Sequence, residues 1–225
     1  MAERTLDDGL WLALSTVTDV ESAGLFRLVD GVATPVEQHR QQWRRGAARQ
    51  SLAQVDALLR AAAPEALVGV VAELGPGSFT GVRLGLAVAR TLAFVDGVPL
   101  VGVASFDVAR RLVGDPDVAV ALPARPRHAY LDVPGVDARE LPITALDEAI
   151  GAHTLVVASG LATGLRAASS RPFTSVDLPD LVAVMAVACD PSQRRGSEPI
   201  YVGVSEAERK GGVQLPDGQL PVRNG

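Results

Sequence analysis

The sequence predicts an α/β protein built of two related halves. Between residues 67 and 112, β-rich runs alternate with segments of helical periodicity, and this alternation is typical of α/β sheets. A weaker version of the same alternation occupies residues 118 to 189. Ahead of both, three apolar runs separated by turn residues indicate an antiparallel unit at the start of the fold.

The opening unit is expected to contain three strands. A short apolar run, Trp11 to Ser15, is followed by Ala23 to Leu28 and by Gly31 to Glu37. Asp30-Gly31 joins the last two runs, and Asp-Gly between apolar runs is a hairpin signal. We therefore expect these strands to pair antiparallel.

A helix is predicted next, over Gly46 to Ala63. Its small and apolar residues recur at alternating steps of four and three, which places them on one helix face. These residues are Ala48, Leu52, Val55, Leu59 and Ala62. Pro64 follows and ends the helix.

The centre of the sequence predicts a buried strand, a tight turn and a long helix. Leu67 to Leu74 is β-rich and leads into Gly75-Pro76-Gly77, which indicates a turn. Ser78 or Thr80 can cap the helix that follows. This helix is expected to reach Val95.

The remaining elements continue the alternation. They are strand Val98 to Val103, helix Ser105 to Leu112 capped by Ser105, strands Val118 to Leu122 and Ala129 to Val133, a helix near Ile143 to Ile150, strand Thr154 to Ala158, and a helix near Leu178 to Cys189. Gly114 to Pro116 is the best boundary, so the expected domains are residues 1–113 and 114–204. Rising charge and glycine content predicts a poorly ordered tail at residues 205–225.

Composition excludes several classes of protein. Hydrophobic residues make up 48% and charged residues 21% of the chain, which is typical of a packed globular protein and not of a disordered one. A net charge of −5 gives no general attraction to a polyanion, so autonomous RNA binding is not expected. No apolar run approaches the roughly 20 residues that span a bilayer, and no basic start leads into an apolar core. A single cysteine predicts a reducing cytoplasm.

The glycine-rich segment Gly75 to Gly85 fits neither standard phosphate motif. A Walker loop requires Gly-Lys-Ser/Thr, but Val82 follows Gly81. The dinucleotide fingerprint requires glycine at its sixth position, where this chain has Thr80. A generic phosphate site made by the backbone amides of the turn stays open.

The helix after this turn is too apolar to bury only one face. Small residues follow each other at steps of four, and Arg83 and Arg90 are the only charged residues between Phe79 and Val95. The small residues are Gly77, Gly81, Gly85, Ala89 and Ala93. We expect a partner helix to approach this stripe closely, because an amphipathic surface helix has a wider polar side. The alternative is burial of the stripe within the chain.

The same segment resembles the signature of the TsaB family, also called YeaZ. The resembling residues are Gly75 to Gly85, Leu86-Ala87, Ala89 and Val98 to Val103. The resemblance covers Leu12 to Phe106, continues weakly through Ala124-Arg125 and Tyr130, and returns at Pro199-Ile200-Tyr201. It implies an actin-like ATPase (ASKHA) fold with two related α/β halves, the second reduced, in a protein without full catalysis.

The resemblance also implies a function in tRNA modification. Similar proteins pair with a TsaD-like transferase and a TsaE-like ATPase, which install threonylcarbamoyl on the adenosine beside the anticodon of tRNA (t6A). In that pairing the first two helices of each partner form a bundle. The interface expected here is Leu52, Val55, Leu59, Gly77, Gly81, Gly85, Ala89 and Ala93. No tightly bound cofactor is expected, and any ATP or ADP would lie at the interface of the complex. We expect the protein to reach tRNA only through the complex. The chain alone can form a homodimer.

Two departures from the family pattern indicate a scaffold. Actin-like ATPases carry an Asp at the end of the first strand, where this chain has Ser15. The family also usually has an Asp before an Ala-Arg pair, and this chain has Pro123 at that position. A hydroxyl brings no charge to a metal ion. We therefore expect a noncatalytic subunit that binds and activates the transferase, with no catalytic residue and no metal ligand. The alternative is an autonomous nucleotide phosphohydrolase that uses the turn Gly75 to Gly77.

Other chemically active side chains are expected to be structural. His39, His128 and His153 have no partner at helical spacing, so we expect them on the surface or in turns. Ser78 does not fit the Gly-x-Ser-x-Gly nucleophile motif and is expected as a helix cap. Cys189 is expected as an inert, buried thiol. A basic cluster is expected to be a solvated face that meets tRNA only within a complex; it comprises Arg40, Arg44, Arg45 and Arg49.

Overall fold

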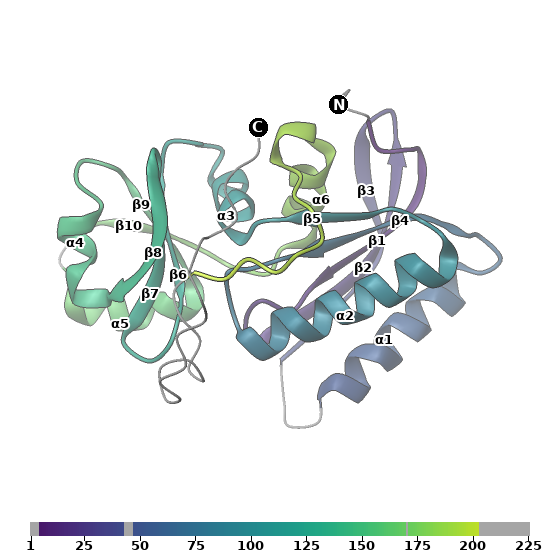
Figure 1. The fold of residues 1–225 in the computed structure, drawn as a ribbon, viewed down its shortest axis with the longest axis horizontal. Helices are drawn as coiled ribbons and strands as arrows, with labels where there is room; N and C mark the ends of the chain where they lie inside the picture. The colour runs from purple at the N-terminus through teal and green to yellow at the C-terminus, as the bar shows by residue number, and fades with distance from the viewer. Residues whose placement is uncertain (1–4, 43–46, 170, 203–225) are drawn as a thin grey trace, which may run out of the picture.

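Two five-stranded sheets form the framework of the chain in the computed structural model, which describes residues 5–42, 47–169 and 171–202 (Figure 1). The first sheet contains β1 (Gly9–Ser15), β2 (Val20–Val29), β3 (Val32–Gln42), β4 (Leu67–Glu73) and β5 (Leu100–Val103). The second contains β6 (Ala119–Pro123), β7 (His128–Val133), β8 (Val136–Pro142), β9 (Leu155–Ala158) and β10 (Phe173–Val176).

Both sheets have the same topology. The first has the order β3-β2-β1-β4-β5 and the second, read the same way, β8-β7-β6-β9-β10. In each sheet the three strands that come first in the chain pair antiparallel. The other two run parallel to the earliest strand, one paired with it and the next beyond. This repeat confirms the prediction of two related α/β halves. The Asp30-Gly31 hairpin is also confirmed: both residues have positive φ, 50° and 76°, as a tight two-residue turn requires.

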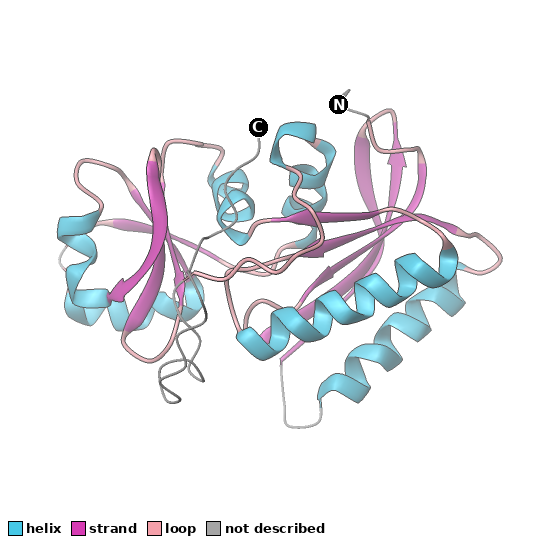
Figure 2. Ribbon diagram, viewed as in Figure 1, coloured by secondary structure: helices cyan, strands magenta, loops and turns pink. Residues whose placement is uncertain are grey.

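Helices α1 (Ala47–Ala62) and α2 (Phe79–Asp96) lie side by side on one face of the first sheet (Figures 1 and 2). Apolar side chains of both helices, among them Leu58 and Leu86, join the core beneath them. As predicted, the Ser78 hydroxyl caps α2 by accepting a hydrogen bond from the Gly81 amide at 3.2 Å. Gly97 ends the helix in the left-handed conformation, with φ 67°.

Helices α3 (Ser105–Val113) and α6 (Leu181–Cys189) lie between the two sheets (Figure 1). Each of these helices follows one sheet in the chain and packs on the other. Helix α3 follows β5 and packs on β6, β9 and β10, and α6 follows β10 and packs on the strands of the first sheet. One core therefore contains residues of both sheets and both helices, such as Trp11, Val156 and Met185. The division at residues 113 and 114 stays a prediction, and the predicted tail at 205–225 lies outside the described residues.

The second half has the same number of strands as the first, but most of its strands and its outer helices are shorter. Its outer helices are α4 (Leu146–Ala149) and α5 (Ser159–Ala168), with 4 and 10 residues against 16 and 18 in α1 and α2. Strands β8 and β10 and helix α5 were not predicted from the sequence, because they are short or rich in polar and small residues. Ser105 does not cap α3, because Ala104 holds the cap position and the Ser105 side chain is buried. Within the described ranges, no helix is long and apolar enough to cross a membrane.

Candidate functional site

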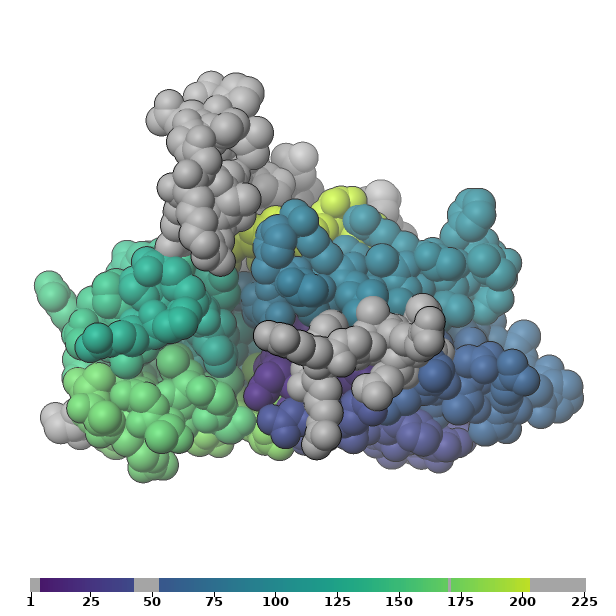
Figure 3. Space-filling model, turned by 90° about the horizontal axis from the view of Figure 1, so that it is seen from below, coloured from purple at the N-terminus to yellow at the C-terminus, as the bar shows by residue number. Residues whose placement is uncertain are grey.

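The outer face of α2 exposes apolar and basic side chains. Thr80, Arg83, Ala87, Arg90 and Phe94 are exposed at helical spacing. Phe94 is 87% exposed, and the neighbouring Val95 is 71% exposed. Atoms of α1 and α2 lie next to each other at the surface of the first half (Figure 3). Phe94 and Val95 together expose contiguous apolar surface, which marks this helix pair as a candidate contact surface.

The small-residue stripe of α2 faces the other way, into the chain. A Cβ atom on Gly77, Gly81 or Gly85 would come within 3.0 Å of Thr16 or Val17 in the β1–β2 turn. Ala89 and Ala93 are also buried, in the core above the first sheet. The prediction that a partner helix closely approaches this stripe is therefore wrong for these glycines. The alternative, burial within the chain, holds for these positions because the β1–β2 turn occupies the space that the missing side chains leave.

Hydrogen bonds fix the glycine face against this turn. Thr16 Oγ1 donates to the carbonyl of Gly81 at 2.7 Å, and the amide of Ser78 donates to the carbonyl of Val17 at 2.7 Å. Because the Ser78 amide is already bonded, the turn has one donor fewer for a phosphate. The generic phosphate site that the sequence left open therefore loses support.

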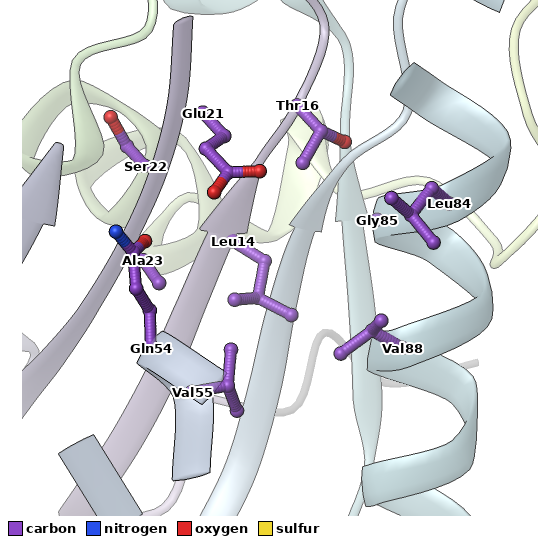
Figure 4. A pocket seen from close by; sticks show the side chains of 10 residues that line it. All are labelled: Leu14, Thr16, Glu21, Ser22, Ala23, Gln54, Val55, Leu84, Gly85 and Val88. Atoms are coloured by element: carbon purple, nitrogen blue, oxygen red, sulfur yellow. The ribbon is translucent and has the colours of Figure 1, made fainter. Parts of the chain in front are cut away.

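The expected interface residues of α1 divide in a similar way. Val55 is buried and Leu59 is partly buried against the same core, while the side chain of Leu52 lies outside the described part of the structure. Between α1 and α2 is a small cavity of about 20 Å³, and Figure 4 shows Val55 and Val88 facing each other across it. This volume is enough for about one water molecule, so the space between the helices is no small-molecule site.

A much larger cleft of about 1140 Å³ lies between the two halves. Its walls include the β1–β2 turn, the start of α2, the β6–β7 turn and the start of α5. Three carboxylates, Asp19, Glu140 and Asp177, line it together with Arg125. Arg125 Nε donates to Glu140 Oε1 at 2.6 Å, so its charge is already compensated.

The described lining of this cleft fits a nucleoside triphosphate poorly. A polyphosphate needs an excess of cationic or amide donors, whereas the lining charges are mostly negative. Arg40, from the predicted basic cluster, pairs with Asp177 at 2.8 Å across the two halves. Arg40 is therefore already paired and is not free for an anion. Arg44 and Arg45 and the side chain of Arg49 lie outside the described residues.

A buried carboxyl group lies beside Ser15, where the family pattern has Asp. The Ser15 hydroxyl donates to Oε2 of Glu73, on the neighbouring strand β4, at 2.5 Å. Glu73 is 2% exposed, and burial raises the pKa of its carboxyl group, while the hydroxyls of Ser105 and Ser15 oppose that shift. Glu73 Oε1 and Ser105 Oγ have no hydrogen-bond partner of good geometry among the described residues.

Glu73 was not predicted from the sequence as a buried acid beside Ser15. Its signal was a carboxyl group at the end of an otherwise apolar strand, Leu67–Glu73. Glu73 is not among the residues that line the cleft. The carboxyl group therefore joins β4 to β1 through the Ser15 hydroxyl and is not placed to orient a metal-bound water in the cleft.

The remaining candidate side chains lie apart from one another. His39 is on β3, His128 begins β7, and His153 precedes β9. Searched over the described ranges, the chain contains no group of three or more His, Cys, Asp or Glu side chains that could hold a metal ion. Cys189 ends α6 half-buried, and burial raises the pKa of its thiol.

Residues 195–202 form an extended segment, the strap, that runs beside α2. The amide of Arg195 donates to the carbonyl of Gly102 at 2.8 Å, and the amide of Ile200 donates to that of Leu74 at 2.8 Å. Arg90 pairs with Glu198 at 2.7 Å. The sequence resemblance includes residues 199–201 but does not predict that they contact α2.

A family model described as TsaD, tRNA N6-adenosine threonylcarbamoyltransferase, matches residues 44–165, which is more than half of the chain. The chain belongs to the TsaD family. Membership connects it with threonylcarbamoylation of tRNA adenosine. No curated protein matches the sequence of this TsaD-family chain.

Two solved structures resemble this TsaD-family chain over their full length. YeaZ from Pseudomonas aeruginosa is 24% identical, with a TM-score of 0.65, over 86% of this chain and 100% of YeaZ. An uncharacterized protein with similarity to peptidase YEAZ, also from Pseudomonas aeruginosa, is 25% identical, with a TM-score of 0.65, over 87% of this chain and 100% of that one. The predicted TsaB (YeaZ) resemblance and the actin-like fold are thereby confirmed.

Proposed function

We propose that this protein is the noncatalytic subunit that binds and activates a TsaD-type transferase in t6A synthesis. The observation that carries the proposal is the outer face of α2, with Phe94 exposed to 87% beside Val95, in a chain of the TsaD family. The contact surface that we assign is this outer face together with the exposed face of α1. It replaces the inward glycine stripe, which is filled from within the chain.

Two polar sites support the absence of catalysis in the isolated chain: the Ser15–Glu73 pair and the cleft between the halves. Ser15 holds no charge, and its partner Glu73 is buried away from the cleft. The charges that line the cleft are mostly negative, which opposes binding of a triphosphate. These features support an accessory role and argue against the alternative of an autonomous phosphohydrolase.

The proposal includes two further partners. A TsaE-like ATPase joins the complex, and tRNA is reached through the transferase, because a net charge of −5 gives this chain little attraction for a polyanion. Any ATP or ADP is held at the interface of the complex and not in the cleft of this chain.

Reconstitution tests this function. The transferase, its ATPase partner, threonylcarbamoyl-adenylate and tRNA are combined with and without the purified chain, and modified adenosine is measured by mass spectrometry. We expect modification to depend on the chain, and the chain alone to neither modify tRNA nor turn over ATP. An equal modification rate in both mixtures would contradict the scaffold role. Steady ATP turnover by the chain alone, abolished in Ser78→Ala or Thr80→Ala, would favour the phosphohydrolase.

A further inference from the structure

Two aromatic rings and one hydrogen bond hold Arg83 at the exposed face of α2. Its guanidinium carbon lies 3.8 Å from the centre of the Phe79 ring and 5.6 Å from that of Tyr201. Its Nε donates to the Tyr201 hydroxyl at 2.8 Å, and the two rings lie 5.5 Å apart. An arginine held by stacking and one hydrogen bond is preorganised, because little conformational entropy remains to be lost when its other N–H groups bind a ligand.

The charge of Arg83 has no carboxylate partner within ion-pair distance among the described residues. Two turns further along α2, Arg90 pairs with Glu198 of the strap at 2.7 Å. Arg83 instead uses only its Nε and the face of its guanidinium group within the chain. Its outer N–H groups are therefore available in a fork that matches a carboxylate.

The strap places Tyr201 at this position. Tyr201 lies 118 residues from Arg83 in the sequence, and the Ile200 amide anchors it by donating to the carbonyl of Leu74 at 2.8 Å. Ile200 also packs against the core. Tyr201 is 39% exposed and Phe79 is 43% exposed, so the strap and α2 together present two aromatic rings around one cation.

From this geometry we infer that Phe79, Arg83 and Tyr201 form a binding hot spot for a carboxylate side chain of a protein partner. The inference rests on the proposed function, and the partner is the transferase. Tyrosine and arginine are enriched at such centres. The surface continues along the exposed side of α2 to Phe94 and Val95, so the partner supplies an apolar helix face with an acidic residue at one end. Tyr201 acts as a positioning residue, because it holds Arg83 in place.

A protein carboxylate fits this site better than an RNA phosphate. The nearby cleft is lined by three carboxylates and one paired arginine, and the chain has a net charge of −5. An RNA backbone carries one negative charge per nucleotide, so several of its phosphates would be repelled by these acidic side chains. A single carboxylate on an apolar helix meets Arg83 alone.

Binding of the full-length chain to the purified transferase, measured by calorimetry at several salt concentrations, tests the inference. We expect Arg83→Ala to weaken binding by about tenfold to a hundredfold and to reduce its salt dependence. Arg83→Lys keeps the charge but loses the planar fork, so it is expected to stay several-fold weak. Tyr201→Phe keeps the ring and loses the hydroxyl, and about threefold to tenfold weaker binding is expected.

Arg166→Ala is the matched control, because Arg166 is an exposed arginine stacked on Phe173 at 5.0 Å on the second half; it is expected to bind like wild type. Equal affinity of wild type and Arg83→Ala would overturn the hot spot and leave the proposed function standing. Weaker binding of tRNA to the complex with unchanged transferase affinity would also overturn it, in favour of an RNA contact. No binding by wild type would overturn the proposed function itself. Thermal melting of each variant identifies any loss of folding, in which case Arg83→Gln decides.

Discussion

The Ser15 hydroxyl donates a 2.5 Å hydrogen bond to Oε2 of Glu73, so the end of β1 meets a carboxyl group on the neighbouring strand instead of carrying one. The pair is sealed from the cleft, with Glu73 2% exposed. A buried carboxyl group is less costly in its neutral form. The carboxyl group at this junction therefore makes the stability of the fold depend on pH.

In wild type, the free energy of unfolding is expected to fall between acidic and neutral pH because of Glu73. Glu73→Gln is expected to remove this fall. Burial raises the folded-state pKa of Glu73 above its ordinary value of 4.5, so the folded chain binds the proton more tightly than the unfolded chain. The stabilising contribution of the neutral group is complete below pH 4.5 and is lost as pH rises through the raised pKa. Urea unfolding of wild type and variant across this range measures the difference.

The exposed Glu148→Gln is the control for this experiment and is expected to keep the pH dependence of wild type. If Glu73→Gln and wild type lose stability in parallel as pH rises, the neutral buried carboxyl group is ruled out.

Gly81→Ala is expected to lower the free energy of unfolding by about 1–3 kcal/mol, because overpacking forces the backbone to shift. The added Cβ would lie within 3.0 Å of the Thr16 carbonyl oxygen, which is backbone and cannot turn away. Gly164→Ala on α5 is the matched control, with its nearest atom at 3.9 Å. That variant should gain about 0.5–1 kcal/mol from helix propensity. Denaturant unfolding compares the two, and an unaffected Gly81→Ala would place the glycine face in open space.

Phe94→Ser is expected to weaken binding to the transferase at least about tenfold while the free energy of unfolding stays within about 0.5 kcal/mol of wild type. The side chain is 87% exposed, so the folded chain alone gains little from it. Val136→Ser, at a 48% exposed position on β8, should bind normally. Calorimetry of the three proteins decides; normal binding by Phe94→Ser would remove this end of α2 from the interface.

Two arginines that form ion pairs are expected to differ in their effect on stability. Arg110 is 14% exposed and pairs with Asp132 at 2.6 Å, while Arg40 is 45% exposed and pairs with Asp177 at 2.8 Å. Arg110→Met leaves the Asp132 carboxylate, 22% exposed, without its ion-pair partner and should cost about 3 kcal/mol. Arg40→Met should cost less than about 1 kcal/mol, since exposed pairs are screened by water and salt. Thermal and urea unfolding measure both, and equal losses would contradict the difference in burial.

Local chemistry in the sequence determined the elements that depend on near neighbours. The Asp30-Gly31 turn, the Ser78 cap and the apolar period of α1 and α2 each act within a few residues, so the helices and the first hairpin could be predicted. The strand and helix alternation likewise indicated two α/β halves. The elements that were missed, such as β8 and α5, have little apolar periodicity of their own and are fixed by packing on their neighbours.

Only the tertiary structure decided which way each face points and which distant residues meet. The step of four in Gly77, Gly81 and Gly85 shows that these residues share a face, but a period cannot tell whether a partner or the β1–β2 turn fills the space. The contacts of Ser15 with Glu73 and of Arg83 with Tyr201 join residues 58 and 118 positions apart. Such contacts depend on strand register and on the path of the strap, which are set by the burial of the whole core and not by any local segment.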